Sequence, residues 1–360
     1  MQLPVNPPVL PMLAKRVDQL PSGDEWIFEP KWDGFRALIF RDGDEILIQS
    51  RDEKPLNRYF PELIDPLRAT LPARCALDGE LVIVRNGELD FDALQLRLHP
   101  AASRVNLLAK QTPSSVVFFD LLCEGDRDLC SEAFRVRRKK LEALLAGAKP
   151  PVHLTPLTRD HGVASDWFRR FEGAGFDGVV AKDISGTYEA NKRVMLKVKH
   201  ERDCDCVVAG FRWHKKGDKD LVGSLLLGLY DDSGNLQHVG VCASFSTAKR
   251  KELVEFLKPY RKDALDKHPW KHWADLSEAD GTKRMPGGQS RWSQGKDLSW
   301  EPLRPELVVE VAYDHMQGDR FRHTAQFRRW RYDKKPADCT YAQLEVVPPQ
   351  EIAEMFPAGR

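Results

Sequence analysis

Two-residue turn signals between short β-rich runs set the strongest limit on how this chain can fold. The turn pairs Asp33-Gly34, Asp42-Gly43 and Asn86-Gly87 follow the runs WIFEPK, FRALIFR and CALDGELVIV. Asp-Gly and Asn-Gly pairs readily enter the left-handed backbone region that tight hairpins require. The first part of the chain is therefore expected to contain antiparallel sheet.

Helical patterns are mixed with these runs up to about residue 200. FRVRRKKLEALLAG, which begins at Phe134, has the apolar spacing of an amphipathic helix and ends in glycine. SVVFFDLL (115–122) is short, apolar and rich in Val and Phe, which is typical of a buried strand. Helices mixed with antiparallel strands predict an α+β domain over residues 1–200.

The pattern changes after 199–205, a short charged segment that we expect to act as an interdomain hinge. Beyond it CVVAGFRW, GSLLLGLYDD, LQHVGVCASF and ELVVEVAYD have the composition of strands, and one segment, AKRKELVEFLKPY, has helical spacing. Five or so strands with one helix predict an all-β barrel of the OB-fold type over residues 201–345. Residues 346–360 are expected to form a C-terminal tail.

Charge and cysteine content exclude several classes of function. Lys+Arg 55 against Asp+Glu 54 gives a net charge of +1, so binding of a polyanion must depend on local clusters of charge. The seven cysteines form no CxxC pair, which favours free thiols in a reducing compartment over a zinc site or a disulfide framework. With no signal-peptide pattern and no apolar run of about 18–20 residues, we expect a soluble cytoplasmic protein with no membrane partner.

The octet EPKWDGFR (29–36) admits two interpretations. If Asp33-Gly34 is a hairpin turn, Lys31 lies in solvent. Alternatively, Lys31 is held for covalent chemistry, with Gly34 making room for a ligand and Arg36 binding its charge. A lysine amine titrates near about 10.4, so a nucleophilic lysine needs desolvation or neighbouring cations.

Charged pairs two residues apart provide further candidates. Asp78 and Glu80 share one strand face, and Lys197 and Lys199 share another, because residues i and i+2 of a strand point the same way. The acidic pair suits a metal ion and the lysine pair suits a phosphate. A solvated strand face for the lysines and core packing for the aromatic pair at 118–119 are the simpler interpretations.

Seven motifs, taken in order, resemble the motif series of the covalent nucleotidyltransferases, which include ATP-dependent DNA ligases, RNA ligases and mRNA capping enzymes. They are KWDGFR (31–36), SR (50–51), DGE (78–80), FFD (118–120), DGVVAK (177–182), LKVK (196–199) and RWRYDK (329–334). The surrounding sequence, such as ANKRVMLKVKHERDCDCVVAGFRWHK and FRHTAQFRRWR, is similar to the compact bacterial ATP-dependent DNA ligases of the ligase C type. The resemblance spans nearly the whole chain.

The resemblance implies a nucleotidyltransferase (adenylation) domain followed by the OB-fold domain, with Lys31 as the residue that ATP adenylylates. It implies that Glu29 contacts adenine, that Phe119 stacks on the base, and that Arg36 and Arg51 bind ribose and phosphates. The other nucleotide-binding residues it implies are Glu80, Lys182, Lys197 and Lys199, and on the second domain Arg329, Arg331, Asp333 and Lys334, which would close over the β- and γ-phosphates.

The implied metal ligands are Glu80 and Asp177, for Mg²⁺ or alternatively Mn²⁺. Two positions depart from the family pattern: Asp177 stands where a glutamate is usual, and Met195 stands where a tryptophan is frequent. The implied reaction runs through a lysine-AMP intermediate and seals a 5′-phosphate to a 3′-hydroxyl at a nick in duplex DNA. We expect a monomer with a role in DNA repair, and the residues do not identify a repair-protein partner.

DNA contacts are expected from local basic clusters. The loop 281–296 carries Lys283, Arg284, Arg291, Lys296 and Trp292, and either contacts the phosphate backbone or is solvated. For the basic run at 135–140 we expect a solvated helix face, with backbone contact as the alternative, and for Trp270 and Trp273 we expect core packing. Binding should be modest and should fall steeply with salt.

Two other function classes remain open on the residues alone. An RNA ligase or a capping-type nucleotidyltransferase would share the KxDG motif, and nucleotide preference and the type of nick separate these from a DNA ligase. A non-catalytic nucleic-acid-binding protein on the same scaffold is the other alternative. The simultaneous presence of Lys31, Glu80, Lys197 and Lys199 favours an active enzyme.

Overall fold

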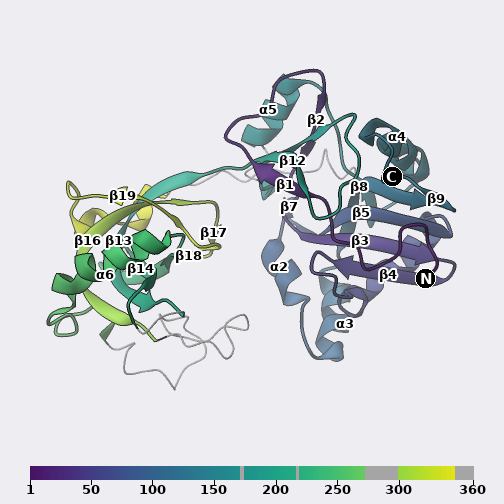
Figure 1. The fold of residues 1–360 in the computed structure, drawn as a ribbon. Coiled ribbons are helices and arrows are strands. Elements are labelled where there is room, and N and C mark those ends of the chain that lie inside the picture. Colours follow the sequence, from purple (N-terminus) through teal and green to yellow (C-terminus); the bar gives the residue numbers. More distant parts are fainter. Residues whose placement is uncertain (171–173, 216–218, 272–298, 345–360) are drawn as a thin grey trace. The chain divides into compact units, whose positions relative to one another are not determined.

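The computed structural model describes residues 1–170, 174–215, 219–271 and 299–344. The chain divides into two compact units, of which Met1–His200 belongs to the first and the described residues from Glu201 onward form the second (Figure 1). Each unit has its own buried hydrophobic core. The loop 281–296, Trp273 and the tail 346–360 lie outside the described residues.

The first unit contains two large sheets. The smaller has four strands in the order β1-β12-β11-β2. These strands are β1 (Leu13–Arg16), β12 (Arg193–Val198), β11 (Val179–Asp183) and β2 (Trp26–Pro30). Strands β11, β12 and β2 pair antiparallel, whereas β1 runs parallel to β12.

The larger sheet has six strands, five of them in the order β10-β8-β5-β3-β4, and β9 pairs with β8. They are β10 (Val152–Leu154), β8 (Ser115–Glu124), β5 (Arg74–Val82), β3 (Phe35–Asp42), β4 (Glu45–Ser50) and β9 (Arg127–Asp128). In Figure 1, β3, β4, β5 and β8 lie side by side. All residues of β8 except its two ends are buried, which confirms the predicted buried strand.

Two of the three turn signals form hairpins as predicted. Asp42 and Gly43 lie where β3 turns into β4, and Gly43 has the positive φ of 62° that favours glycine. Asn86 and Gly87, with φ of 52° and 80°, join the short strands β6 (Val84–Arg85) and β7 (Glu88–Leu89). Local turn chemistry is sufficient to specify both hairpins.

The third signal, Asp33-Gly34, does not form a hairpin, so that interpretation of Lys31 is wrong. The pair connects β2 in the smaller sheet with β3 in the larger sheet. A Cβ atom at Gly34 would lie 2.1 Å from the carbonyl oxygen of Leu81. Gly34 is therefore required by the close approach of strand β5, and the space beside it is filled by the chain rather than by a ligand.

Among the described residues of this unit, five α-helices accompany the sheets. They are α1 (Ile64–Thr70), α2 (Phe91–Leu96), α3 (Ala102–Gln111), α4 (Phe134–Leu145) and α5 (His161–Arg170). Helix α4, which the sequence predicts, packs against β8 and buries Phe134, Leu141 and Leu145. The remaining residues on its buried face are arginines.

The expected solvated face of α4 is wrong for two of its five cations. Arg137 is fully buried and donates from Nε and Nη2 to the Asp120 carboxylate at 2.7 and 3.0 Å. Arg138 is also buried, whereas Arg135 and Lys139 are exposed. The two buried arginines are stabilised by the carboxylates of Asp120 on β8 and Glu29 on β2, which the sequence of α4 does not indicate.

The second unit is built on five strands in the order β15-β14-β13-β16-β19. They are β13 (Arg202–Trp213), β14 (Val222–Tyr230), β15 (Leu236–Cys242), β16 (Glu301–Tyr313) and β19 (Gln326–Trp330), with helix α6 (Thr247–Arg261) and the small hairpin β17 (Met316–Gln317) and β18 (Arg320–Phe321). A bridge between Cys242 and Ala325 joins the two ends of this order. The closure confirms the predicted OB-type barrel.

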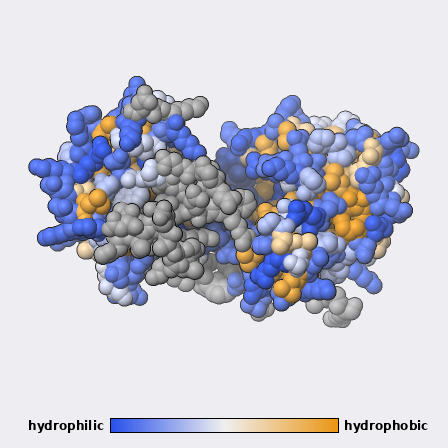
Figure 2. All heavy atoms as spheres, turned by 90° about the horizontal axis from the view of Figure 1, so that it is seen from below, coloured by the Kyte–Doolittle hydropathy of each residue, from blue (hydrophilic) through white to orange (hydrophobic). Residues whose placement is uncertain are grey.

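Trp270 lies in the barrel core, as predicted, and its indole Nε1 donates to the carbonyl of Leu236 at 2.7 Å. On the face seen in Figure 2, hydrophilic side chains predominate among the described residues that are visible, with hydrophobic residues in patches between them. None of the helices in the described part of the chain is long and apolar enough to cross a membrane.

Candidate active site

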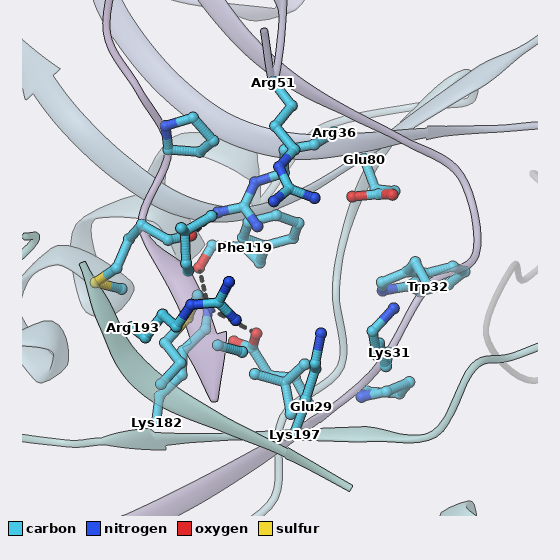
Figure 3. A pocket seen from close by; sticks show the side chains of 17 residues that line it. Glu29, Lys31, Trp32, Arg36, Arg51, Glu80, Phe119, Lys182, Arg193 and Lys197 are labelled. Carbon is cyan, nitrogen blue, oxygen red and sulfur yellow. Dashed lines mark hydrogen bonds and ion pairs between the residues drawn. The ribbon is translucent and has the colours of Figure 1, made fainter. Parts of the chain in front are cut away.

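A cavity of about 200 Å³ lies between the two large sheets of the first unit (Figure 3). Both sheets contribute charged or aromatic side chains to it, and the segment between β2 and β3 adds Lys31 and Trp32. The lining residues are Pro11, Met12, Leu13, Ala14, Glu29, Pro30, Lys31, Trp32, Arg36, Arg51, Glu80, Phe119, Val180, Lys182, Arg193, Met195 and Lys197. The site therefore gathers residues that are up to 186 positions apart in sequence (Pro11 to Lys197).

Strand alternation explains which residues of the smaller sheet enter the cavity. Arg193, Met195 and Lys197 are two apart on β12, and Val180 and Lys182 are two apart on β11. Residues at this spacing point to the same side of a sheet. One face of the smaller sheet thus presents three cations to the cavity.

The larger sheet contributes Arg36 from β3, Glu80 from β5 and Phe119 from β8. Arg36 pairs directly with Glu80 across the β3–β5 ladder, so their side chains are neighbours. The guanidinium of Arg36 lies 4.6 Å from the centre of the Phe119 ring. Phe118, the residue before it, is buried in the core on the opposite face of β8, as the simpler interpretation predicts for that ring.

Lys31 is fixed by its backbone as well as by its side chain. Its N–H donates to the carbonyl of Gly178 and its carbonyl accepts from the N–H of Asp177, both at 2.9 Å. Gly178 has φ +125°, and a Cβ there would lie 2.0 Å from the carbonyl oxygen of Val198. Only glycine allows this approach, which brings Lys31, Asp177 and the end of β12 together.

The Asp177 carboxylate forms ion pairs with two lysines. Its Oδ2 lies 2.5 Å from Lys31 Nζ and 2.7 Å from Lys199 Nζ. Burial lowers the pKa of the Lys31 amine, but the charge and hydrogen bond of Asp177, together with Glu80 and Asp33, outweigh burial and raise that pKa. In this state the ion pair with Asp177 favours the protonated Lys31 side chain, which is not a nucleophile.

Two other groups in the cavity have displaced pKa values. Burial, followed by the positive charges of Lys31 and Lys199, lowers the pKa of Lys197 to about 8. Burial raises the pKa of the Glu80 carboxyl to about 7, against the opposing effect of Arg36 and Lys31. Groups with displaced pKa values that share one cavity are typical of a catalytic centre.

A buried carboxylate behind the cavity holds Arg36 in place. Arg36 donates from Nε and Nη2 to the two Asp78 oxygens at 2.5 Å each. The Tyr188 hydroxyl donates to Asp78 Oδ2 at 2.7 Å, and Asp78 is fully buried. Asp78 therefore orients Arg36, while Glu80, two residues on, faces the cavity.

Glu29 on β2 and Lys182 on β11 line the cavity from the smaller sheet. Glu29 is 3% exposed, and its Oε2 lies 2.7 Å from Lys182 Nζ. Lys182 also donates to the carbonyl of Phe119 at 3.1 Å. Figure 3 shows these two contacts as dashed lines beneath Phe119. The Lys182 cation is thus neutralised inside the protein, and its carboxylate partner faces the cavity.

Eight of the residues predicted for the nucleotide site line the cavity: Glu29, Lys31, Arg36, Arg51, Glu80, Phe119, Lys182 and Lys197. Asp177 and Lys199 are not among the lining residues, although Asp177 forms an ion pair with Lys31 and Lys199 forms an ion pair with Asp177. The motif comparison missed Trp32, Met195 and Arg193 as lining residues. Arg193 lies four residues before Lys197 on the same strand, so strand alternation places both side chains on one face and would have identified Arg193.

The predicted residues of the second unit gather around Asp205 on β13. Asp205 lies 3.0 Å from Arg331 Nη1 and 2.8 Å from Lys334 Nζ. Arg331 also pairs with Asp333 at 2.9 Å, and Arg329 pairs with Glu310 at 2.8 Å. The motif RWRYDK therefore forms a cluster of ion pairs within the second unit.

Comparison with known proteins gives consistent matches over both units. A family model described as ATP dependent DNA ligase domain matches residues 11–199, and one described as ATP dependent DNA ligase C terminal region matches residues 218–334. The chain is 56% identical to DNA ligase C2 of Mycolicibacterium smegmatis over 349 residues, which is 97% of each chain. It is 51% identical to DNA ligase C of Mycobacterium tuberculosis over 364 residues, covering all of both chains.

A solved structure from work on Lig E DNA ligases has the same fold. It is 17% identical to this chain, with a TM-score of 0.54, and the match covers 90% of this chain and 100% of the other. The predicted architecture, a nucleotidyltransferase domain of antiparallel sheets and helices followed by an OB-fold domain, is confirmed.

Proposed function

Because the chain belongs to the family of ATP-dependent DNA ligases, we propose that Lys31 is the residue that ATP adenylylates. The enzyme is a DNA ligase that uses ATP to seal nicks. The observation that supports Lys31 is its position in the cavity, with its backbone fixed to Asp177 and Gly178 and its amine among the cations of β12.

The reaction proceeds in three covalent steps. The deprotonated Lys31 amine attacks the α-phosphorus of ATP, so that a P–N bond forms, the bond to pyrophosphate breaks and the amine loses a proton. The 5′-phosphate at the nick then attacks the same phosphorus and releases the lysine. Finally the 3′-hydroxyl attacks the activated 5′-phosphate, which forms the phosphodiester and releases AMP.

The residues of the cavity divide between the two ends of the nucleotide. Glu29 and Phe119 both line the cavity and both lie next to the Lys182 ammonium, and they suit the base, by a carboxylate contact to an amino group and by stacking. Lys197, Arg51 and Arg36 suit the ribose and phosphates, because cations that are already in position stabilise charge that develops on phosphoryl oxygens. Lys199 would join them once its ion pair with Asp177 opens.

A divalent cation, Mg²⁺ or Mn²⁺, fits the carboxylates that are present. Glu80 lines the cavity, and Asp177 lies next to Lys31. In the described part of the chain no three His, Cys, Asp or Glu side chains form a group that could hold a metal. Mg²⁺ commonly binds one or two carboxylates and completes its shell with substrate phosphates and water. When bound with ATP, the ion would neutralise phosphate charge, with Glu80 and Asp177 as its protein ligands.

We assign residues 1–200 to nucleotide binding and residues 201–345 to the OB-fold domain, which would supply Arg329, Arg331 and Lys334 to the β- and γ-phosphates. These cations are already oriented by Asp205 and Glu310. The DNA substrate is a nicked duplex held through its phosphates. We place the activity in the cytoplasm, in DNA repair, and in a monomer.

The proposal is tested by intact-mass measurement after incubation with Mg²⁺ and either ATP or GTP. The protein is first stripped with pyrophosphate to remove any AMP already bound. One added AMP from ATP is expected in the wild type and in Lys110→Ala, an exposed lysine of α3, but not in Lys31→Ala. A GMP adduct would indicate capping-type chemistry, and an AMP adduct retained by Lys31→Ala would exclude Lys31 as the nucleophile.

A further inference from the structure

Arg138 of helix α4 lies outside every motif that carries the family resemblance, yet it reaches the wall of the ATP cavity. Its side chain is 8% exposed. The guanidinium is shared among three partners: Nη1 donates to Glu29 Oε1 at 3.3 Å, Nη2 donates to the carbonyl of Thr155 at 2.8 Å, and Nε donates to Glu142 Oε1 at 2.7 Å. A planar guanidinium can hold several acceptors in a fixed geometry.

The first contact fixes the orientation of Glu29. One carboxylate oxygen of Glu29 faces Arg138, and the other lies 2.7 Å from Lys182 Nζ. Glu29 is nearly fully buried, so its charge depends on these two cations for stabilisation. Held from both sides, the carboxylate has a single position at the cavity wall, two residues before Lys31.

The second contact reaches the other side of Lys31. The Thr155 carbonyl accepts from Arg138, while the Thr155 hydroxyl accepts from the indole Nε1 of Trp32 at 2.9 Å. Trp32 follows Lys31 directly and is 4% exposed. Arg138 therefore contacts Glu29 directly and Trp32 through Thr155, and these two residues lie on either side of Lys31 in the sequence.

We propose that Arg138 is a positioning residue that holds Glu29 for recognition of the adenine base and holds the segment around Lys31 for attack. This inference rests on the proposed function of the cavity. Adenine presents an amino donor where guanine presents a carbonyl acceptor. A Glu29 carboxylate held in one position accepts from the former and repels the latter, so Arg138 contributes to the choice of ATP over GTP without touching the nucleotide.

Removal of Arg138 changes the balance of charge at this wall. Glu29 keeps Lys182 but loses its other cation, and the Thr155 carbonyl loses its donor. The carboxylate can then rotate toward Lys182, away from the position in which it accepts from adenine. A lysine at position 138 would keep the charge near Glu29 but could not reach Glu29, Thr155 and Glu142 together.

The test compares Arg138→Met and Arg138→Lys with Lys140→Met, a control on the same helix that removes a partly exposed ion pair with Glu124. Initial rates of lysine-AMP formation are measured against ATP and GTP concentration by intact mass, and sealing of a pre-adenylated nick is measured separately. Tm is recorded for every variant to show that it is folded.

For Arg138→Met we expect the KM for ATP to rise about tenfold or more, the scale of one hydrogen bond to a buried charge, and the preference for ATP over GTP to fall. Arg138→Lys should recover part of both, and Lys140→Met should behave as the wild type. Sealing of the pre-adenylated nick should change less than lysine-AMP formation, since that step needs no choice of base.

A double-mutant cycle with Glu29→Gln distinguishes positioning from general damage. If Arg138 acts through Glu29, the effect of Arg138→Met on nucleotide preference should largely disappear in the Glu29→Gln background. An undiminished effect there, or an unchanged ATP preference in a folded Arg138→Met or Arg138→Lys protein, would overturn the inference. Absence of any adduct in the wild type would instead refute the proposed function itself.

Discussion

The Asp177 carboxylate lies 2.5 Å from the Lys31 ammonium and 2.7 Å from that of Lys199, so one acid holds two lysines together. This contact keeps Lys31 protonated in the absence of nucleotide, although burial favours the neutral amine. Binding of ATP and a divalent cation would draw Asp177 away from Lys31, and the amine would then lose its main stabilising charge. If Lys31 is the nucleophile as proposed, the ion pair would link nucleotide binding to its activation.

Replacing Asp177 with Asn is expected to lower the pKa of Lys31, because burial is then opposed only by weaker, more distant carboxylates. The pH dependence of Lys31 acetylation by acetic anhydride, followed by peptide mass spectrometry with EDTA present, measures this pKa directly. The midpoint should lie above that of an ordinary lysine in the wild type and at lower pH in the variant. An unchanged midpoint would show that Asp177 does not control the charge of Lys31.

The same contact has a consequence for stability. Since the folded-state pKa of Lys31 is raised, the stability that the ion pair contributes is present at neutral pH and is lost only as pH rises through the folded pKa, above the ordinary value of 10.5. Asp177→Asn should therefore lose less Tm than the wild type as pH rises through this alkaline range, because the variant has no Lys31–Asp177 pair to lose. An equal fall of Tm in the two proteins would contradict this.

In the second unit, replacing Asp205 with Asn is expected to slow lysine-AMP formation about tenfold, the scale of one hydrogen bond to a charged group. Arg331 would keep Glu310 and Asp333, but Lys334 would lose the carboxylate 2.8 Å from its Nζ. Asp203→Asn is the matched control, because Asp203 lies two residues earlier on β13, pairs at 3.5 Å with Arg328 and is more than half exposed. Equal losses in the two variants, or an equal loss in sealing of a pre-adenylated nick, would contradict a specific role of Asp205 in the first step.

Gly178→Ala is expected to destabilise the first unit by at least about 1–3 kcal/mol, since the new methyl group meets the Val198 carbonyl oxygen and the backbone has φ +125°. Gly147→Ala, which has open space around the added methyl group, should change stability by less than about 0.5 kcal/mol. Urea unfolding of both variants tests the pair, and a Gly178→Ala protein as stable as the wild type would contradict the steric requirement.

The Arg137–Asp120 pair is buried on both sides, with side chains 1% exposed, so removal of one partner leaves an unpaired charge. Arg137→Met should lower the free energy of unfolding by about 3–5 kcal/mol, and combining it with Asp120→Leu should restore part of the loss. Arg68→Met, which breaks a surface pair with Asp65, should cost no more than about 1 kcal/mol. The free energies of unfolding are measured with urea. If Arg137→Met and Arg68→Met lower them by similar amounts, burial does not determine how much an ion pair contributes to stability.

Local features of the sequence determined much of the fold. The hairpin at Asp42-Gly43, the buried strand at 115–122 and helix α4 depend on backbone preference and on apolar spacing within a few residues, so they could be predicted. The order of the motifs likewise brought Lys31, Glu80 and Lys197 into one expected site, and these three side chains do line one cavity.

Tertiary structure decided the features that depend on partners far along the chain. Asp33-Gly34 marks a change of direction of the chain. Because β2 before it pairs with β11 and β3 after it pairs with β5, the chain crosses from one sheet to the other there, and the local sequence does not specify this pairing. Arg137 and Arg138 are buried because Asp120 and Glu29 approach them from β8 and β2. An amphipathic pattern specifies which helix face carries charge; only the fold supplies the distant carboxylates that make burial of that charge stable.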